Sequence, residues 1–461
     1  MFRFFLIILL TLSLVIQPAL AQEEMTLIRD AEIEHYLHDL SAPIFRAAKL
    51  NPDNVDLVLV QNQTLNAFVA GGQNIFFFTG LLTTTETPEQ LQGVIAHETG
   101  HIAGGDLIRG TKAMENASRQ VILGMIAAVL AGVASGRGDV AVGAIGGAQS
   151  VAEQTYLSYS REQESAADAA ALRFLDMIGQ SADGFLSFMK TLAGQEYIPE
   201  EQRIAYARTH PLSQERIDNI EHHINTTKNK KKTLPAQFAQ QHLRMKAKLM
   251  GYLNPETALL RYTDLDPRVE ARYARAIALY RKSETPRALT LVESLLKDEP
   301  DNPFFHELKG QILFENGHTE QAVQAYQRTI ELLPDSALLC SAYAHAMLET
   351  NNPNYLDETI KQLSHSIQKE PDSPQNWRFL ATAWHRRYEE KKDDLYKGLV
   401  LYARAEESLA LGQNEAANRY AEEAAQILPK KSPYWLRTQD IKINTDKDKD
   451  KDEKETPSKD R

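Results

Sequence analysis

His97-Glu98-Thr99-Gly100-His101 is the stretch of this 461-residue sequence that decides its fold class. The two histidines are four residues apart, so on a helix both rings project from one face toward a single metal ion. Glu98 lies between them and is placed to act as general base on a zinc-activated water. Pro88 after Thr87 is typical of a helix start, and Gly104-Gly105 is typical of a helix end. The stretch therefore predicts a helix that carries two zinc ligands and a catalytic carboxylate.

A third metal ligand is needed, because catalytic zinc usually keeps three protein ligands and one open position. Glu164 and Asp168 are four residues apart on a predicted helix, so both carboxylates can face the site. We expect Glu164 to bind one zinc ion per chain and Asp168 to accept a hydrogen bond from His97 or His101, which would fix that ring's tautomer. Two alternatives stay open: Glu162 as the ligand, or acidic residues on a solvated helix face.

The surrounding pattern predicts a mostly helical α+β domain with a small sheet. Asn74–Phe78 follows Gly71-Gly72 and is expected to form an exposed sheet edge beside the zinc, where an extended substrate could pair. Its three consecutive phenylalanines favour the alternative of an interior strand. The other predicted strands are 55–60 and 66–69, and the predicted helices are 26–49, 87–104, 154–177, 183–194 and 213–224.

The segment 121–147 is rich in alanine and glycine. Its apolar part is too short for a confident membrane span. A buried helix with a glycine-rich loop is slightly favoured over a mobile cover above the active site.

The second half of the chain repeats. Pro300 and Pro334 are 34 residues apart, which is the tetratricopeptide period, and the next interval, to Pro371, is 37 residues. The longer interval predicts a short insertion near 351–354. Small and large residues occupy the positions where that repeat needs them: Gly310, Leu313, Ala322 and Tyr326. An all-α solenoid is expected, with a concave surface that binds a protein partner or the substrate itself.

The N-terminus has the pattern of a signal peptide, with Arg3, an apolar run over 4–16 and Ala19-Leu20-Ala21 before the expected cleavage point. A retained anchor is the alternative, although the apolar run is short for a span. Cleavage changes the net charge from −11 to −12, which disfavours a nucleic-acid partner. Cys340 is the only cysteine, so export without an intramolecular disulfide favours a bacterial periplasm.

The predicted organisation follows from these patterns. It comprises a signal peptide over 1–21, a zinc metallopeptidase domain over 22–227, a linker over 228–255, a tetratricopeptide-repeat domain over 256–438 and a disordered charged tail over 439–461.

The motifs together resemble a known family. The HExxH stretch, the later Glu164 and Asp168, and His210-Pro211 followed by Arg216-Ile217 are similar to the gluzincin metallopeptidases of the HtpX-like group. Export and C-terminal repeats narrow the resemblance to the BepA-type β-barrel assembly-enhancing proteases of the periplasm. The resemblance implies that His97, His101 and Glu164 bind zinc, that Glu98 catalyses, that Asp168 supports the site, and that His210 has a role.

Two roles are open for His210. It is either a fourth zinc ligand that excludes water, or, once it is displaced, it or Arg216 donates to the oxyanion of the tetrahedral intermediate. A loop histidine that caps a helix is the simpler alternative.

The resemblance implies an endopeptidase that degrades misfolded or misassembled outer-membrane proteins and assists their assembly. Its expected partners are those unfolded proteins and, through the repeats, the β-barrel assembly machinery, with peripheral association with the membrane. The alternative function is a periplasmic chaperone or adaptor that acts through its repeats, with a largely silenced protease site.

Overall fold

The structure is a computed structural model of the 461-residue chain. It describes residues 26–105, 161–193, 206, 209–227 and 232–442. The expected signal peptide, the 121–147 segment and most of the expected tail lie outside these residues. The expected tail starts at 439, whereas residues 433–442 are helical and Ile441 is fully buried. This apolar residue packs on the last helices, so the folded part extends beyond the predicted boundary.

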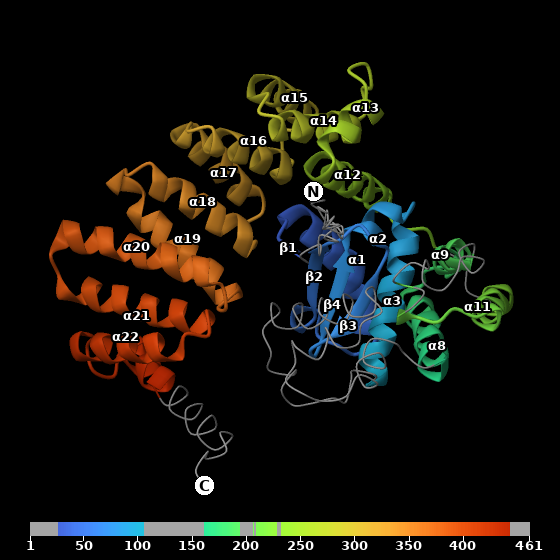
Figure 1. The fold of residues 1–461 in the computed structure, drawn as a ribbon, viewed down its shortest axis with the longest axis horizontal. Coiled ribbons are helices and arrows are strands. Elements are labelled where there is room, and N and C mark those ends of the chain that lie inside the picture. Colours follow the sequence, from blue (N-terminus) through green and yellow to red (C-terminus); the bar gives the residue numbers. More distant parts are fainter. Residues whose placement is uncertain (1–25, 106–160, 194–205, 207–208, 228–231, 443–461) are drawn as a thin grey trace, which may run out of the picture.

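The N-terminal domain contains a four-stranded sheet of order β1-β2-β4-β3 (Figure 1). Its strands are β1 (Thr26–Ile28), β2 (Asp56–Gln61), β3 (Ala67–Ala70) and β4 (Asn74–Phe78). β3 and β4 form a hairpin, in which Gly71 and Gly72 have positive φ angles of 59° and 88°. β4 pairs in parallel with β2, and β1 pairs antiparallel with β2. The predicted small sheet is therefore confirmed, and β1 is an addition to it.

The expectation that 74–78 forms the sheet edge is wrong. β4 lies between β2 and β3, with Val58 opposite Phe76 on one side and Phe68 opposite Phe76 on the other. All five residues of β4 are buried, because its apolar side chains pack on both faces of the sheet. The outer strand on this side of the described sheet is β3.

The N-terminal domain has six described helices, of which the first three in the chain contact the sheet and the last three pack on the third helix or on one another. The structure confirms the helices predicted there within the described residues, except that residues 26–28, predicted as the start of the first helix, form β1. Thr87 caps α3 by accepting a hydrogen bond from the amide of Gln90, and Gly105 ends it at a φ of 68°. The short helix α2 was not predicted. The helices are α1 (Ala31–Ala47), α2 (Thr79–Thr84), α3 (Pro88–Gly104), α8 (Arg161–Ile178), α9 (Asp183–Ala193) and α11 (Gln214–Thr226).

Helices α3 and α8 approach each other closely through small residues. A Cβ atom on Gly100 would lie 2.7 Å from the carbonyl oxygen of Ala167 and 2.9 Å from its Cα. Only glycine fits at this contact, which brings the backbone of α8 directly against the HExxH helix. The close approach allows short side chains on α8 to reach the same point as the histidines on α3.

Helix α12 (Ala236–Leu253) occupies most of the range expected to be a linker. Met245 and Leu249 belong to the core of the N-terminal domain, whereas Ala247 packs on the first helices of the solenoid. At Gly251 an added Cβ would lie 2.8 Å from the carbonyl oxygen of Ala274, so α12 also touches the solenoid closely. The connection is thus a helix shared between two cores.

The C-terminal half is an all-α solenoid of stacked helical hairpins, which confirms the predicted fold class, and it curves round the N-terminal domain (Figure 1). Within one hairpin a Cβ on Gly310 would lie 3.1 Å from the ring of Tyr326, which explains the small and aromatic pair of the repeat. The predicted insertion is the 3₁₀ turn Pro353–Tyr355. The helices are α13 (Pro255–Arg261), α14 (Val269–Arg281), α15 (Thr285–Asp298), α16 (Pro303–Glu315), α17 (Thr319–Leu332), α18 (Ala337–Glu349), α19 (Leu356–Lys369), α20 (Pro374–Lys391), α21 (Asp394–Ala410) and α22 (Asn414–Ile427).

A buried charge cluster joins the two halves. The ammonium group of Lys248 on α12 lies 2.8 Å from Asp30, 3.5 Å from Glu32 and 3.6 Å from Glu307 of α16. Lys248 and Glu32 are only 3% and 2% exposed. Breaking such a buried pair leaves an uncompensated charge, so the cluster holds one orientation of the solenoid against the N-terminal domain.

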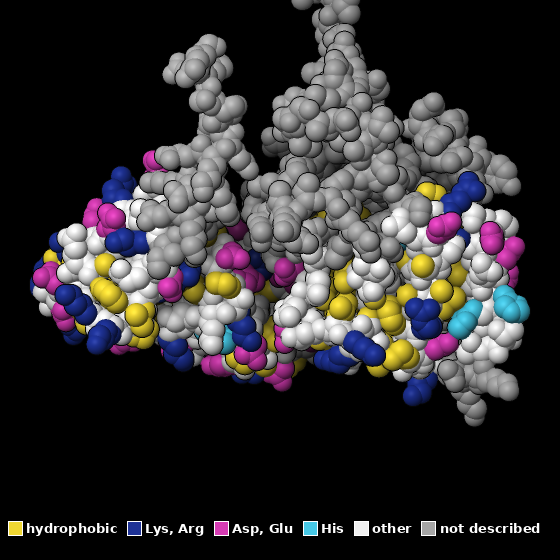
Figure 2. Space-filling model, turned by 90° about the horizontal axis from the view of Figure 1, so that it is seen from below, with side chains coloured by type: hydrophobic (Ala, Val, Ile, Leu, Met, Phe, Trp, Pro, Cys, Tyr) yellow, Lys and Arg dark blue, Asp and Glu magenta, His cyan; other side chains and the backbone are white. Residues whose placement is uncertain are grey.

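The described surface shows no single-sign patch on the face in Figure 2, where acidic and basic side chains are interspersed. This distribution differs from the basic stripe typical of nucleic-acid binding. Among the residues that the structure describes, no helix combines the length and the hydropathy needed to cross a lipid bilayer.

Candidate metal centre

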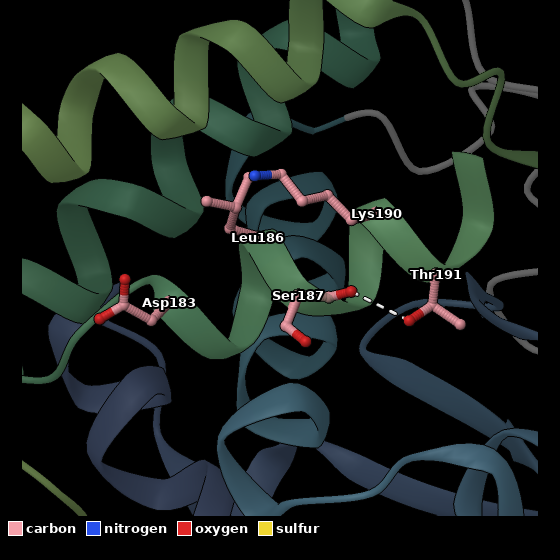
Figure 3. A pocket seen from close by; sticks show the side chains of 5 residues that line it. All are labelled: Asp183, Leu186, Ser187, Lys190 and Thr191. Atoms are coloured by element: carbon pink, nitrogen blue, oxygen red, sulfur yellow. Dashed lines mark hydrogen bonds between the residues drawn. The ribbon is translucent and has the colours of Figure 1, made fainter. Parts of the chain in front are cut away.

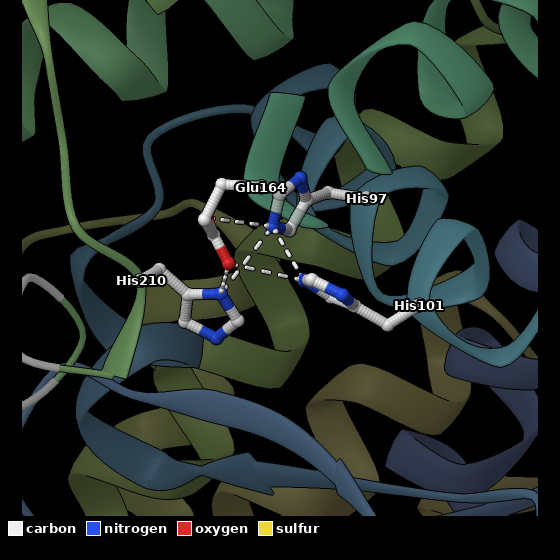
Figure 4. Close-up of side chains that lie close together, drawn as sticks. All are labelled: His97, His101, Glu164 and His210. Atoms are coloured by element: carbon white, nitrogen blue, oxygen red, sulfur yellow. Dashed lines mark hydrogen bonds and ion pairs between the residues drawn. The ribbon is translucent and has the colours of Figure 1, made fainter. Parts of the chain in front are cut away.

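Four buried side chains converge on one point: His97 and His101 from α3, Glu164 from α8, and His210 from the segment before α11 (Figure 4). One ligand atom from each lies within 4.8 Å of all the others. The Nε2 atoms of His97 and His101 are 3.1 Å apart, and Nδ1 of His210 lies 3.0 Å from Oε1 of Glu164. Helical spacing on α3 and the close contact at Gly100 produce this convergence.

The donor set fits a divalent cation such as zinc. Ring nitrogens face one another at 3.1 Å and 3.3 Å in a pocket where the side chains of His97 and Glu164 are fully buried. Neutral imidazoles and a carboxylate are the ligands that zinc prefers. Burial lowers the pKa of His97, but the carboxylates of Glu164 and Asp168 raise it to about 10. The same charges that favour a proton at His97 would favour a metal cation in its place.

Asp168 lies behind His97 rather than behind His101. Its Oδ1 is 2.8 Å from Nδ1 of His97, which leaves Nε2 of that ring directed at the metal position. A carboxylate on the far nitrogen fixes the tautomer and raises the basicity of a metal-binding histidine. Burial alone would raise the pKa of Asp168. The hydrogen bonds from Arg216 and His97 outweigh this effect, so the pKa is lower than usual and the carboxyl group is anionic.

Arg216 is committed to the acidic residues of the site. Its Nε and Nη2 donate to the two oxygens of Asp168 at 2.6 and 2.8 Å, and its Nη1 lies 2.6 Å from Oε2 of Glu164 and donates to the carbonyl of Pro211 at 2.9 Å. The expectation that Arg216 assists an oxyanion is therefore not favoured. It acts as a positioning residue that fixes both carboxylates.

Glu98 is fully buried, and in the described part of the chain neither of its carboxylate oxygens has a hydrogen-bond partner. His210 approaches it, with Nε2 at 3.5 Å from Oε1 of Glu98. Buried carboxylates are almost always satisfied, so this one is poised for a group from outside the chain. Water or a substrate is the natural partner at a position between two metal-binding histidines.

His210 is held from two further sides. Its Nε2 lies 3.2 Å from the carbonyl oxygen of Ala67 on β3, so a proton on Nε2 leaves the Nδ1 lone pair for the metal. Its ring also stacks on Tyr206, with centroids 4.4 Å apart and planes at 24°. The structure therefore places His210 as a fourth member of the cluster.

The remaining predicted and possible sites lie elsewhere. Glu162 is exposed on α8, apart from the cluster. A hollow of about 480 Å³ on α9 is lined by Asp183, Leu186, Ser187, Lys190 and Thr191, and contains none of the clustered residues (Figure 3).

Sequence reasoning did not find Tyr206 or the Ala67 carbonyl. Tyr206 is four residues before His210, a spacing that could have indicated it on a helical turn. A backbone carbonyl leaves no signal in a sequence.

Comparison with known proteins agrees with the metal site that the geometry describes. Residues 28–224 match Peptidase family M48. The Beta-barrel assembly-enhancing protease of Yersinia pestis is 24% identical over 366 residues, which are 77% of this chain and 73% of that protein. Its namesake in Escherichia coli (strain K12) is 22% identical over the same shares. Metalloprotease YcaL of Escherichia coli (strain K12) is 28% identical over 186 residues, which are 39% of this chain and 66% of that protein.

Proposed function

We propose that this chain, a zinc metalloprotease with an M48 peptidase domain over residues 28–224, cleaves unfolded or misassembled outer-membrane proteins in the periplasm and assists their assembly. Support comes from relatives named for β-barrel assembly, which match 77% of this chain. The signal-peptide pattern at residues 1–21 supports export. The observation that carries the proposal is the unpartnered Glu98 beside the buried His97, His101 and Glu164 cluster.

The chemistry assigns one role to each group. His97, His101 and Glu164 would hold one zinc ion, which when bound lowers the pKa of a coordinated water and polarises the substrate carbonyl. Glu98 takes a proton from the attacking water and delivers it to the leaving amine. Asp168 and Arg216 keep His97 and Glu164 in place.

Substrate access is proposed along β3. This strand is the outer strand of the described sheet, and the carbonyl of Ala67 lies beside His210 at the site. An extended peptide that takes over the contact of the Ala67 carbonyl would pass across the metal, and hydrogen bonds to the backbone tolerate many side-chain sequences. Such a mode suits a protease that must accept many unfolded chains.

Partner binding is proposed for the later repeats. Helix α16 is already engaged by α12, since Glu307 lies beside Lys248 and Gln311 accepts a hydrogen bond from the hydroxyl of Tyr252. Farther along, His345 is stacked on Phe379 at 4.3 Å with its side chain 32% exposed. This partly exposed aromatic pair is suited to an unfolded protein or to the assembly machinery.

The second candidate function is a chaperone or adaptor with a largely silent protease site. One observation favours it: His210 completes a four-ligand cluster and occupies the position that water needs.

The two functions can be separated in cells that lack the protein and are challenged with misfolded outer-membrane proteins. Wild type, Glu98→Gln and the surface control Glu162→Gln are compared for rescue of assembly. Proteolysis as the main activity predicts loss of rescue in Glu98→Gln alone. Equal rescue by all three would show that chaperoning dominates.

A further inference from the structure

Tyr206 carries a hydroxyl group that is buried in the fold. The residue is 1% exposed, and its oxygen has no hydrogen-bond partner among the residues that the structure describes. Leaving a buried polar group unsatisfied costs about 1–3 kcal/mol, and native proteins contain few such groups. Phenylalanine would fill the same space without this penalty. The hydroxyl therefore requires an explanation outside the folded core.

The surroundings of Tyr206 place it at the metal centre. Its ring stacks on His210, and Phe188 contacts it edge-on with centroids 5.5 Å apart. Its backbone amide donates to the carbonyl of Leu65 at 3.1 Å, just before β3. These contacts fix Tyr206 independently of His210, so the tyrosine stays in place when the imidazole leaves the cluster. Departure of His210 would uncover the face of Tyr206 toward the site.

We infer that Tyr206 is a further catalytic residue, whose hydroxyl donates a hydrogen bond to the scissile carbonyl oxygen of the substrate once His210 has moved off the metal position. This inference rests on the proposed peptidase function and deepens it. The hydroxyl keeps its proton during the step and shares it with the oxygen that becomes negative as water attacks the carbonyl carbon. Donors that are already in place for the developing charge lower the barrier most.

Two points support this role. A phenol has an ordinary pKa of about 10, so the Tyr206 hydroxyl keeps its proton and can donate it at neutral pH. The other strong donor nearby, Arg216, already bonds Asp168 and lies beside Glu164. Among the described residues around the cluster, Tyr206 is thus a fixed donor with an unused proton.

The test uses the full-length, zinc-loaded protein and the substitution Tyr206→Phe, which retains the ring against His210 and Phe188. We expect wild-type zinc content, unchanged KM and a melting temperature equal to or above that of wild type. We also expect kcat to fall roughly 100-fold. Affinity for a phosphinic pseudopeptide, whose phosphinate imitates the tetrahedral oxyanion, should fall by a similar factor. The control Tyr36→Phe removes a buried hydroxyl that bonds His242 and should change neither kcat nor this affinity.

A second arm repeats both measurements in a His210→Ala background. Direct donation predicts the same loss on adding Tyr206→Phe, whereas an effect that disappears there would show that Tyr206 acts only through His210 and would overturn the inference. Wild-type kcat and phosphinate affinity in Tyr206→Phe would overturn it as well. Failure of the proposed function has a different signature, because wild type itself would then bind no zinc or cleave no peptide.

Discussion

Nε2 of His210 lies 3.2 Å from the carbonyl oxygen of Ala67, the first residue of the outer strand β3. The same ring directs Nδ1 at Glu164 and the metal position, 3.0 Å from that carboxylate. One imidazole thus covers both the fourth coordination position and a backbone acceptor that a substrate strand would use. Displacing it requires a peptide that replaces both contacts, which favours extended, unpaired chains over folded proteins.

Replacing His210 with alanine should raise the rate of hydrolysis of an unfolded substrate while leaving one zinc ion per chain. The reason is that His97, His101 and Glu164 suffice for a catalytic site, and removing the fourth ligand admits water. Zinc content is measured by metal analysis and cleavage with a quenched fluorogenic peptide. A lower rate with full zinc would instead assign His210 to transition-state stabilisation. An unchanged rate would remove it from the site.

Asp168→Asn should weaken zinc binding roughly 10- to 100-fold, the usual effect of removing the carboxylate behind a metal-binding histidine. The amide retains the shape but loses the charge that holds both His97 and Arg216. Competition with a zinc chelator measures the affinity. Asp176→Asn is the matched control, because Asp176 lies on the same helix and pairs with His223 at the surface. Equal affinities in the two variants would contradict the account of Asp168.

Gly100→Ala should separate α3 from α8. The added Cβ would lie 2.7 Å from the carbonyl oxygen of Ala167, a backbone atom that moves only with its helix. We expect a loss of about 1–3 kcal/mol in the free energy of unfolding, from overpacking. Zinc affinity should also fall, since Glu164 is on the displaced helix.

The exposed Ala103 provides the control for this contact. Ala103→Gly should reduce stability through helix propensity, by about 0.5–1 kcal/mol, but leave zinc affinity unchanged. Wild-type zinc affinity in Gly100→Ala would show that the helix contact does not position Glu164.

Whether an interaction could be predicted from the sequence depends on whether its residues are close together along the chain. The spacing of His97 and His101, and that of Glu164 and Asp168, are properties of single helices, so the pattern indicates which face each pair shares. The structure brings both histidines and Glu164 together with His210 and places Asp168 behind His97, as the sequence and the family resemblance lead one to expect.

Contacts between distant segments were harder to predict. The position of β4 between β2 and β3 depends on pairing between strands, and its phenylalanines are compatible with either an edge or an interior strand. Helix α12 was expected to be a linker because the lysine run at 230–232 breaks the apolar pattern just before it. Arg216 and Asp168 are 48 residues apart in the sequence, so no local sequence pattern predicts that they pair.

His242 provides a prediction for pH. It is buried, with Nδ1 accepting from the hydroxyl of Tyr36 and Nε2 donating to the carbonyl of Thr85, each at 2.9 Å. Burial, with a smaller effect from Lys246, lowers the pKa of His242 to about 4. As the pH falls, the imidazole of His242 therefore binds a proton near pH 6.5 in the unfolded chain, but only near pH 4 in the folded chain. Stability that is present above pH 6.5 is lost as the pH falls toward 4, by about 3 kcal/mol in total.

Denaturant unfolding of wild type and His242→Gln between pH 7.5 and 4.5 measures this effect. The variant should lose less stability than wild type over that range, although it starts lower at neutral pH. Because both proteins contain the same metal centre, acid release of zinc contributes equally and cancels in the comparison. Parallel stability curves would show that His242 does not titrate as described.

Zinc-dependent hydrolysis by Glu98 tests the account most directly. Purified wild type and Glu98→Gln are assayed side by side for bound zinc and for cleavage of an unfolded outer-membrane β-barrel protein. We predict one zinc ion per chain in both proteins and a cleavage rate at least roughly 100-fold lower in Glu98→Gln, as expected when a general base is removed. Cleavage by Glu98→Gln at the wild-type rate would contradict the assignment of the catalytic centre.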